Sequence, residues 1–307
     1  MPIKQKMLVL LDGSDRSRLT LDYIASVKPF RTASLVLFYV YSQIPECYWD
    51  LDNDPTRPNA VKGFEVWKKE KLAKIEAFMQ EARKRLVQAG FAERDIAINI
   101  HERERGIARD ILEESRKGYD AIILRRRGMG TIQGIALGSV SNKLLSRLPE
   151  APILLAGQRV HNHNLIIAVD GSPSSVRAVD FVAGQFGSYD YSVELFHVIR
   201  GVGTLNPTNP EFIPAEMFTL IQKEVMRRME ELKQKLITAG FSEEKVSGKV
   251  LSGAESRAEE IVREAEAADC GTIIVGRKGV SRVQDFFMGR VCYKVIQGAR
   301  DFTVWVI

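Results

Sequence analysis

An internal repeat is the feature that most constrains how this chain of 307 residues can fold. One copy of each repeated segment lies in each half, and the matches align Asp12 with Asp170. The matching pairs are MLVLLDGSDRS (7–17) with IIAVDGSPSS (166–175), LVLFYVY (35–41) with VELFHVI (193–199), and LVQAGF (86–91) with LITAGF (236–241). Repetition over the whole length predicts a tandem duplication of one domain. We place the two domains at residues 1–157 and 158–307.

Each half reads as alternating strands and helices. The strands are short, continuous apolar runs, which is typical of parallel strands that are buried on both faces. We predict strands near 7–12, 35–40, 96–101, 120–124 and 152–156, and near 164–169, 192–198, 246–251, 271–275 and 301–307. We predict helices near 16–28, 62–89, 106–117 and 139–148, and near 173–186, 214–239, 255–268 and 290–299. The alternation predicts an α/β fold with two tandem doubly wound domains.

The first strand of each half ends in an aspartate that is followed by Gly-Ser. In the second half, Ser172 suits a helix N-cap and Pro173 suits the first helical position, and Ser14 is the equivalent cap in the first half. Asp12 and Asp170 stand at the carboxyl ends of their strands, where open α/β sheets bind their ligands. Both aspartates are therefore candidate ligand-binding residues.

A glycine-rich segment follows a buried strand and precedes a helix in both halves. It reads RRRGMGTIQGIALGSV at 125–140 and GRKGVSRVQDFFMGRV at 276–291. Ten positions separate Gly128 from Gly138, and ten also separate Gly279 from Gly289. Glycine lets a backbone approach a ligand closely, and a helix N-terminus attracts anions. The segment favours a phosphate site, although two turns that need glycine would produce the same pattern.

Better-known nucleotide and catalytic motifs are absent from the sequence. The chain has neither the GxxxxGK[ST] loop of P-loop proteins nor a GxGxxG fingerprint after its first strand. It also lacks a GxSxG elbow and an HExxH helix, so no residues can be named for hydrolytic chemistry. We therefore expect no enzymatic activity beyond slow ATP hydrolysis at most.

The strand–GxxGx9G(S/T) pattern, together with the aspartate and the DGS opening, resembles the universal stress protein family, and the resemblance covers nearly all of both halves. It implies a five-stranded parallel sheet in each half, with strand order 3-2-1-4-5. It further implies ATP bound with adenine near the aspartate and the end of the second strand, and with ribose and phosphates in the glycine loop. The matching nucleotide-binding residues are Asp12, Val40, Gly128, Gly138, Ser139 and Val140 in the first half, and Asp170, Val198, Gly276, Gly279, Gly289 and Val291 in the second. Arg125 and Arg290 stand in the same two loops and are further candidates.

Each half departs once from this family pattern. Arg125 replaces the first glycine in the first half, and Arg290 replaces the hydroxyl residue after the last glycine in the second. Either arginine could pair with phosphate, or it could fill an empty pocket. The first alternative predicts a stress-response regulator that binds ATP, with or without Mg²⁺, in at least one half. The second predicts a degenerate stress protein that acts through an unidentified protein partner.

Composition narrows the remaining classes. No apolar run reaches the roughly 18–20 residues of a membrane helix, and the short N-terminal run reads as a strand, so we expect a cytoplasmic location. A net charge of +5 without an extended basic stripe does not favour nucleic-acid binding. Three cysteines without a CxxC pair are expected to be reduced. We do not expect a metal site at His161 and His163, because no cysteine or carboxylate cluster accompanies them.

Two further segments bear on assembly. The final segment, DFTVWVI, is an apolar edge strand, and such an edge invites pairing with another strand. Together with the family resemblance, it predicts an intramolecular pseudo-dimer of the two halves, and a homodimer through terminal strands as a further possibility. Met217, Met226 and Met229 lie on a long charged helix, where we expect core or dimer packing rather than contact with a cofactor.

Overall fold

The computed structural model describes residues 4–42, 58–126, 137–148, 151–159, 161–200, 214–279 and 288–307. The chain forms two compact units, each treated by itself below. The first unit contains Met1–Val27 and Arg31–Arg125, and the second unit contains Lys28–Phe30 and Arg126–Ile307. The predicted domain boundary after residue 157 stays a prediction, because compactness and sequence repetition divide the chain at different places.

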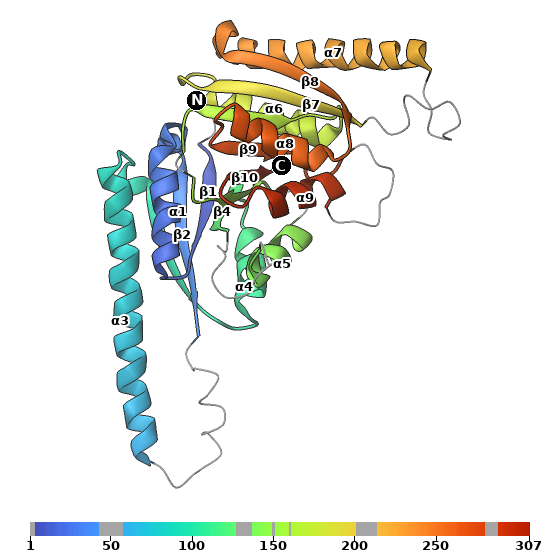
Figure 1. Ribbon diagram of the computed structural model, residues 1–307. Coiled ribbons are helices and arrows are strands. Elements are labelled where there is room, and N and C mark those ends of the chain that lie inside the picture. The colour runs from blue at the N-terminus through green and yellow to red at the C-terminus, as the bar shows by residue number, and fades with distance from the viewer. Residues whose placement is uncertain are drawn as a thin grey trace. The chain divides into compact units, whose positions relative to one another are not determined.

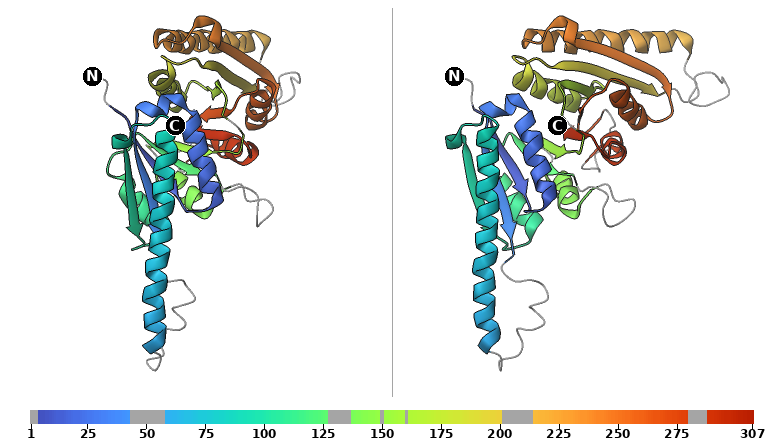
Figure 2. Two further views of the ribbon diagram at one scale, coloured as in Figure 1. Left: turned by 90° about the vertical axis from the view of Figure 1, so that its left-hand side faces the viewer. Right: turned by 60° about the vertical axis from the view of Figure 1, so that its left-hand side comes forward.

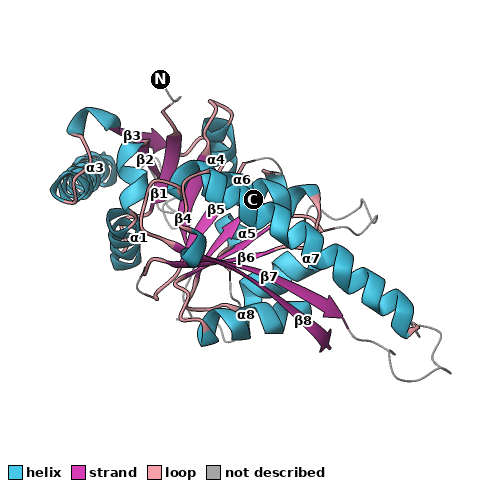
Figure 3. Cartoon of the chain, turned by 90° about the horizontal axis from the view of Figure 1, so that it is seen from above, coloured by secondary structure: helices cyan, strands magenta, loops and turns pink. Residues whose placement is uncertain are grey.

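The first unit is a four-stranded parallel sheet covered by helices. Its strands follow the order β3-β2-β1-β4. Helix α1 packs against the long helix α3, and α4 lies on the other side of the strands (Figures 1 and 3). Figure 2 shows that α3 extends well past the ends of these strands. The elements are β1 (Lys6–Leu11), α1 (Asp15–Ser26), β2 (Ser34–Tyr41), α3 (Pro58–Gln88), β3 (Ile96–Glu102), α4 (Ile107–Ser115) and β4 (Ala121–Arg125).

The second unit holds the other strands and helices. Strands β8, β7, β6, β9 and β10 are parallel and adjacent in that order. Helices α6 and α7 pack together, as do α8 and α9 (Figure 1), and α6 lies on the opposite face of the strands from α8 (Figure 3). The elements are α5 (Ser139–Arg147), β5 (Ile153–Ala156), β6 (Asn164–Ala168), α6 (Pro173–Phe186), β7 (Ser192–Arg200), α7 (Ala215–Thr238), β8 (Val246–Ala254), α8 (Arg257–Ala267), β9 (Thr272–Val275), α9 (Arg290–Gly298) and β10 (Thr303–Val306).

These elements confirm the predicted fold class. All ten predicted strands and all eight predicted helices are present within the described residues, and three short 3-10 helices are added. The strand order of the second half is the order that the family resemblance implies. Strands β4, β9 and β10 carry mainly apolar residues that are fully buried, as strands covered on both faces must be.

The last strand pairs within the chain. Strand β10 lies antiparallel to β5, with Trp305 opposite Leu154, so the apolar edge of DFTVWVI is covered by the last strand of the first half. Trp305 is fully buried and packs against the rings of Phe181 and Phe186. This pairing is the strand contact expected of an intramolecular pseudo-dimer. A homodimer stays a prediction.

The predicted helix starts are also confirmed. The Ser172 side chain accepts a hydrogen bond from the Ser175 amide, and Pro173 begins α6. The Ser14 side chain accepts from the Ser17 amide at the start of α1. These caps fix each helix directly after an aspartate turn, so they also fix where the candidate carboxylates stand.

Candidate functional site

In the second unit, the aspartate turn is tied to the start of the glycine loop. The Asp170 carboxylate accepts a hydrogen bond from the Ser172 amide at 3.0 Å. Ser172 Oγ donates to the carbonyl oxygen of Lys278 at 3.1 Å. Gly171 between them has φ +76°, a conformation that glycine adopts without strain. The two segments that the sequence marked as ligand-binding are therefore neighbours.

The three glycines of this loop have different local reasons to be glycine. A Cβ added at Gly276 would lie 2.8 Å from the Ser175 amide nitrogen, so this position is glycine because the loop packs on the start of α6. A Cβ at Gly279 would lie 2.7 Å from Asp170 Oδ2. A Cβ at Gly289 would lie 3.4 Å from the Gly279 amide nitrogen. Gly279 therefore keeps the space beside the Asp170 carboxylate open, and Gly289 lets the start of α9 pack closely against the loop backbone.

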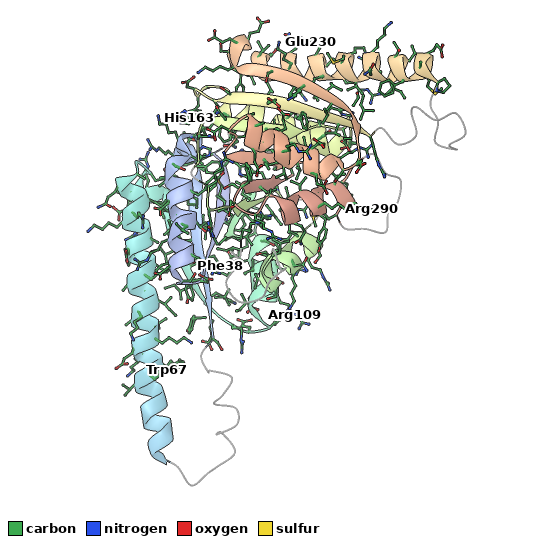
Figure 4. The ribbon with its side chains drawn as sticks, in the orientation of Figure 1. Phe38, Trp67, Arg109, His163, Glu230 and Arg290 are labelled. Atoms are coloured by element: carbon green, nitrogen blue, oxygen red, sulfur yellow. The ribbon has the colours of Figure 1, made fainter. Side chains whose placement is uncertain are left out.

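Helix α9 begins at this place with an uncapped N-terminus. Gly289 is its N-cap residue and has no side chain to accept the first helical amides. Arg290 is the first helical residue and is exposed (Figure 4), and Val291 follows it. Free amides at a helix N-terminus, next to an exposed guanidinium, form an arrangement that suits an anion. Helix α5 begins in the same way, with Gly138 as N-cap before Ser139 and Val140.

A cavity of about 450 Å³ opens at the same strand ends. One side is formed by residues that follow or end the strands, namely Val169, Asp170, Gly171 and His197. Helix α7 forms the other side with six apolar residues, Met217, Leu220, Ile221, Val225, Met229 and Leu232, and with the pair Glu224 and Arg228. The cavity is thus mostly apolar, with a few polar groups concentrated at the strand ends, as in small-molecule sites generally.

The sequence did not reveal the part that α7 plays here. Met229 is buried, as core packing predicts, and it also lines the cavity, whereas Met217 is exposed and lines the cavity rather than a core. Periodicity showed the helix but not which strand ends it covers. Val198, which was predicted as a site residue, lies beside His197 and is buried, and its carbonyl oxygen accepts a hydrogen bond from Arg257 Nε at 3.2 Å.

The charged groups of the cavity are held by short contacts. Arg228 Nε donates to Glu224 Oε1 at 2.7 Å. Hydrogen bonds from Arg227 and Arg228 lower the pKa of Glu224 to about 2. Burial lowers the pKa of His197, an effect that its bond to the Val169 carbonyl and the nearby Asp170 only partly oppose. At neutral pH the site therefore contains an ion pair, a carboxylate and an uncharged imidazole.

Arg277 turns away from the ligand side of the loop. Its amide donates to the Ile307 carbonyl at 2.6 Å, and its own carbonyl accepts from the Gly289 amide at 2.8 Å. Its side chain is only 2% exposed and donates to the carbonyls of Leu145 at 2.7 Å and Ala151 at 3.0 Å. This arginine therefore anchors the loop to the segment around α5 and β5.

The first half carries a counterpart of this anchor. Arg126, which aligns with Arg277, is 3% exposed, and its Nη1 contacts the carbonyl of Ala299 at the end of α9. Sequence reasoning missed both anchors, because an arginine in a glycine loop looks like a phosphate ligand.

The strand-end edge of the first unit is arranged differently. Asp12 accepts hydrogen bonds from the Ser14 amide at 3.1 Å, from Ser14 Oγ at 2.6 Å and from Ser17 Oγ. Partial desolvation of this carboxyl acts to raise its pKa, but the bonds from Ser14 and Ser17 outweigh that effect and lower it. Tyr39 Oη donates to the Asp12 carbonyl at 3.1 Å, and a Cβ at Gly13 would lie 3.1 Å from that hydroxyl. Neighbouring side chains therefore occupy this aspartate turn.

Arg125 ends β4 in the first unit at the position that Gly276 holds in the second half. The side chain is partly buried, and burial together with the nearby Arg16 lowers its pKa. Val40 is partly exposed near the end of β2. Gly128 lies outside the described residues, and Gly138, Ser139 and Val140 belong to the second unit. Whether the first-half candidates form one site therefore stays a prediction, because they are divided between the two units.

The histidine pair packs around Tyr191. His161 Nε2 lies 3.0 Å from Tyr191 Oη, and the His163 ring lies tilted against the same tyrosine, with ring centroids 4.7 Å apart. Where side chains are described, no group of three or more His, Cys, Asp or Glu residues is placed to hold a metal ion. The described helices also include none that is both long enough and apolar enough to span a membrane.

Comparison with known proteins decides the family. The model of the universal stress protein family matches residues 4–155 and again residues 161–307. The chain belongs to the universal stress protein family. It is a tandem universal stress protein, because the two matches together cover nearly the whole chain.

Individual relatives agree with this assignment. A universal stress protein from Mycolicibacterium smegmatis is 25% identical over 66% of this chain and 67% of its own length. The universal stress protein YxiE from Bacillus subtilis is 26% identical over 44% of this chain and 92% of its own length. The crystal structure of a universal stress protein from Archaeoglobus fulgidus matches 98% of this chain and 97% of its own, with a TM-score of 0.64 at 18% identity. The structural similarity to the Archaeoglobus fulgidus protein, which extends over both chains, supports the tandem fold.

Proposed function

We propose that this universal stress protein is a cytoplasmic stress-response regulator that binds ATP, or a related adenine nucleotide, in its second half. The observation that carries the proposal is that one carboxylate, Asp170, borders both the cavity under α7 and the opening of the glycine loop. A nucleotide base needs a mostly apolar slot, and phosphates need free backbone amides. Asp170 lies next to both kinds of surface. The family resemblance implies the same division of the ligand.

The residues of the site divide into two groups by chemistry. The cavity walls of α7, with Asp170 and His197 at the strand ends, suit adenine and part of the ribose. The backbone at Gly279 and the amides that follow Gly289 suit the phosphates, and Arg290 adds an exposed positive charge. Arg290 thus acts as a phosphate partner rather than as a plug, because it is exposed at the helix start instead of filling the cavity.

Any Mg²⁺ would accompany the nucleotide rather than occupy a protein cage. Mg²⁺ keeps several water ligands and is commonly bound through phosphate oxygens with one or two carboxylates. We propose that hydrolysis is slow or absent and that occupancy itself is the signal, since the sequence contains no recognisable hydrolytic motif.

Isothermal titration of the full-length chain with Mg-ATP, after bound nucleotide has been stripped and identified, tests the proposal. We expect one site per chain. Arg290→Ser should weaken binding, and Arg125→Gly should leave it unchanged, because Arg125 lies in the first unit. No heat and no co-purified nucleotide would overturn the proposal. Two equal sites would overturn the assignment to the second half.

A second role, in protein–protein interaction, is favoured for the first half. Its aspartate turn is occupied by Tyr39 and by the two serines that bond to Asp12, and Arg125 stands where the loop glycine is expected. The alternative of a degenerate half that binds a protein partner therefore applies to this half of the chain. Partner capture that is lost on deletion of the first half, but not in Asp170→Asn, is the expected result.

A further inference from the structure

His197 is the cavity residue whose chemistry goes beyond the proposed function. Its ring forms part of the wall at the end of β7, next to Asp170. Nδ1 lies 2.7 Å from the Val169 carbonyl oxygen. A carbonyl oxygen can only accept a hydrogen bond, so Nδ1 must carry the hydrogen. In a neutral ring, Nε2 then carries a lone pair and can only accept.

The surroundings keep this ring neutral. Burial is the main cause of its lowered pKa, and Arg257 on α8 acts in the same direction. Asp170 acts in the opposite direction, and the remaining charges on the cavity wall, Glu224 and Arg228, are paired with each other. At neutral pH the strand-end side of the cavity therefore offers the His197 ring nitrogen as a hydrogen-bond acceptor.

A base that enters this side of the cavity must present hydrogen-bond donors. Adenine carries an amino group at C6, whereas guanine and hypoxanthine carry a carbonyl oxygen there. A carbonyl oxygen that faces the imidazole lone pair would oppose two acceptors and leave the ring nitrogen without a donor, which is costly. Building on the proposed function, we infer that His197 is a specificity-determining residue that selects a 6-aminopurine nucleotide over a 6-oxopurine nucleotide.

The first half offers a matched control at the equivalent position. Tyr39 aligns with His197, and its hydroxyl donates to the Asp12 carbonyl. The two residues make similar bonds to the strand-end backbone, but only the histidine leaves a second ring atom with a lone pair. Tyr39→Phe thus removes a comparable bond without touching the cavity.

The test is a titration of the full chain with three triphosphates: ATP, purine riboside triphosphate, which lacks the amino group, and inosine triphosphate, which has an oxygen in its place. We expect ATP to bind about three- to tenfold more tightly than the deamino analogue, and inosine triphosphate to bind more weakly still. In His197→Phe, ATP and the deamino analogue should agree within about twofold. In Tyr39→Phe the wild-type order should persist.

Each outcome separates the inference from the function on which it rests. If none of the three nucleotides binds, the proposed function fails and the inference fails with it. If ATP binds but the deamino analogue binds equally well, or if His197→Phe keeps the preference, only the inference fails. Should His197→Phe not fold, nitrogen NMR of the wild-type ring decides. The Nε2 resonance should shift with ATP and stay unchanged with the deamino analogue.

Discussion

The two strand-end edges of this duplicated protein descend from one pattern and have diverged in their use of hydrogen bonds. Asp12 accepts three bonds from two neighbouring serines, and Tyr39 covers the turn beside it. Asp170 borders a cavity of about 450 Å³, and Gly279 keeps the space beside its carboxylate open. Neighbouring side chains therefore occupy the repeated aspartate turn in the first half, whereas the same turn borders a cavity in the second half.

Substitution of the buried arginine that anchors the glycine loop should have the largest effect on stability. In Arg277→Ala the carbonyls of Leu145 and Ala151 lose their buried donor, and a cavity is left. We expect a loss of about 2–4 kcal/mol in the free energy of unfolding, measured by urea denaturation. Arg290→Ala, at an exposed position, is the control and should change stability by less than about 0.5 kcal/mol. Equal effects of the two substitutions would contradict the anchoring role.

Acid should weaken the second unit through His161. Burial lowers the pKa of this ring to about 4, and His163 contributes in the same direction. The unfolded chain takes up a proton near pH 6.5 and the folded one only near pH 4, so stability is full above pH 6.5 and falls as the pH drops to 4. We expect a loss of about 2–3 kcal/mol over this interval.

His161→Gln is the variant that isolates this effect, because it removes the titrating group. The difference in stability between wild type and variant, followed from pH 6.5 to 4, reports the contribution of the His161 ring. Thermal unfolding at half-unit pH steps measures it. Parallel curves for the two proteins would show that the ring is not the cause.

Exchanging the first loop residue sharpens the comparison of the two halves. Gly276→Ala places a Cβ 2.8 Å from the Ser175 amide nitrogen, so α6 or the loop must shift. We expect a destabilisation of about 1–3 kcal/mol. The reciprocal change, Arg125→Gly, meets no such contact and should cost less than about 1 kcal/mol, mostly from added backbone freedom. A cost for Arg125→Gly as large as that for Gly276→Ala would show that the two loops pack alike.

The smallest expected effect compares the two aspartates directly. Asp170→Asn keeps the shape of the side chain and its bond from the Ser172 amide, and it removes the negative charge. We expect about tenfold weaker ATP binding, or about 1.4 kcal/mol. Asp12→Asn should leave the affinity unchanged. Titration calorimetry on both variants checks this, and equal losses would place ATP in the first half as well.

Much of this architecture could be read from the residues. Apolar strands such as AIIL and TIIV, each followed by glycine and helix signals, predicted every β-strand and α-helix among the described residues, but not the three 3-10 helices. The caps Ser14 and Ser172 were predictable because capping is local chemistry over three residues. The pairing of β10 was predictable in kind, since an apolar terminal strand needs a neighbour.

The cavity and the loop anchors were not predictable in this way. Nothing in the periodicity of α7 says that Met217 and Met229 cover the ends of β6 and β7, because that depends on how the helix packs across the sheet. Nothing near Arg277 in the sequence indicates that it reaches the carbonyl of Leu145. Contacts between distant segments are set by packing, not by local pattern.

The sequence by itself therefore determined the duplication, the order of strands and helices, and the aspartate and glycine positions at the strand ends, because each depends on residues close together in the chain. Only the tertiary structure decided that Asp170 opens onto a cavity while Asp12 is occupied by its neighbours. It also decided that Arg277 is an anchor while Arg290 faces solvent. The physical reason is that burial and hydrogen bonding depend on which distant side chains arrive at a given place.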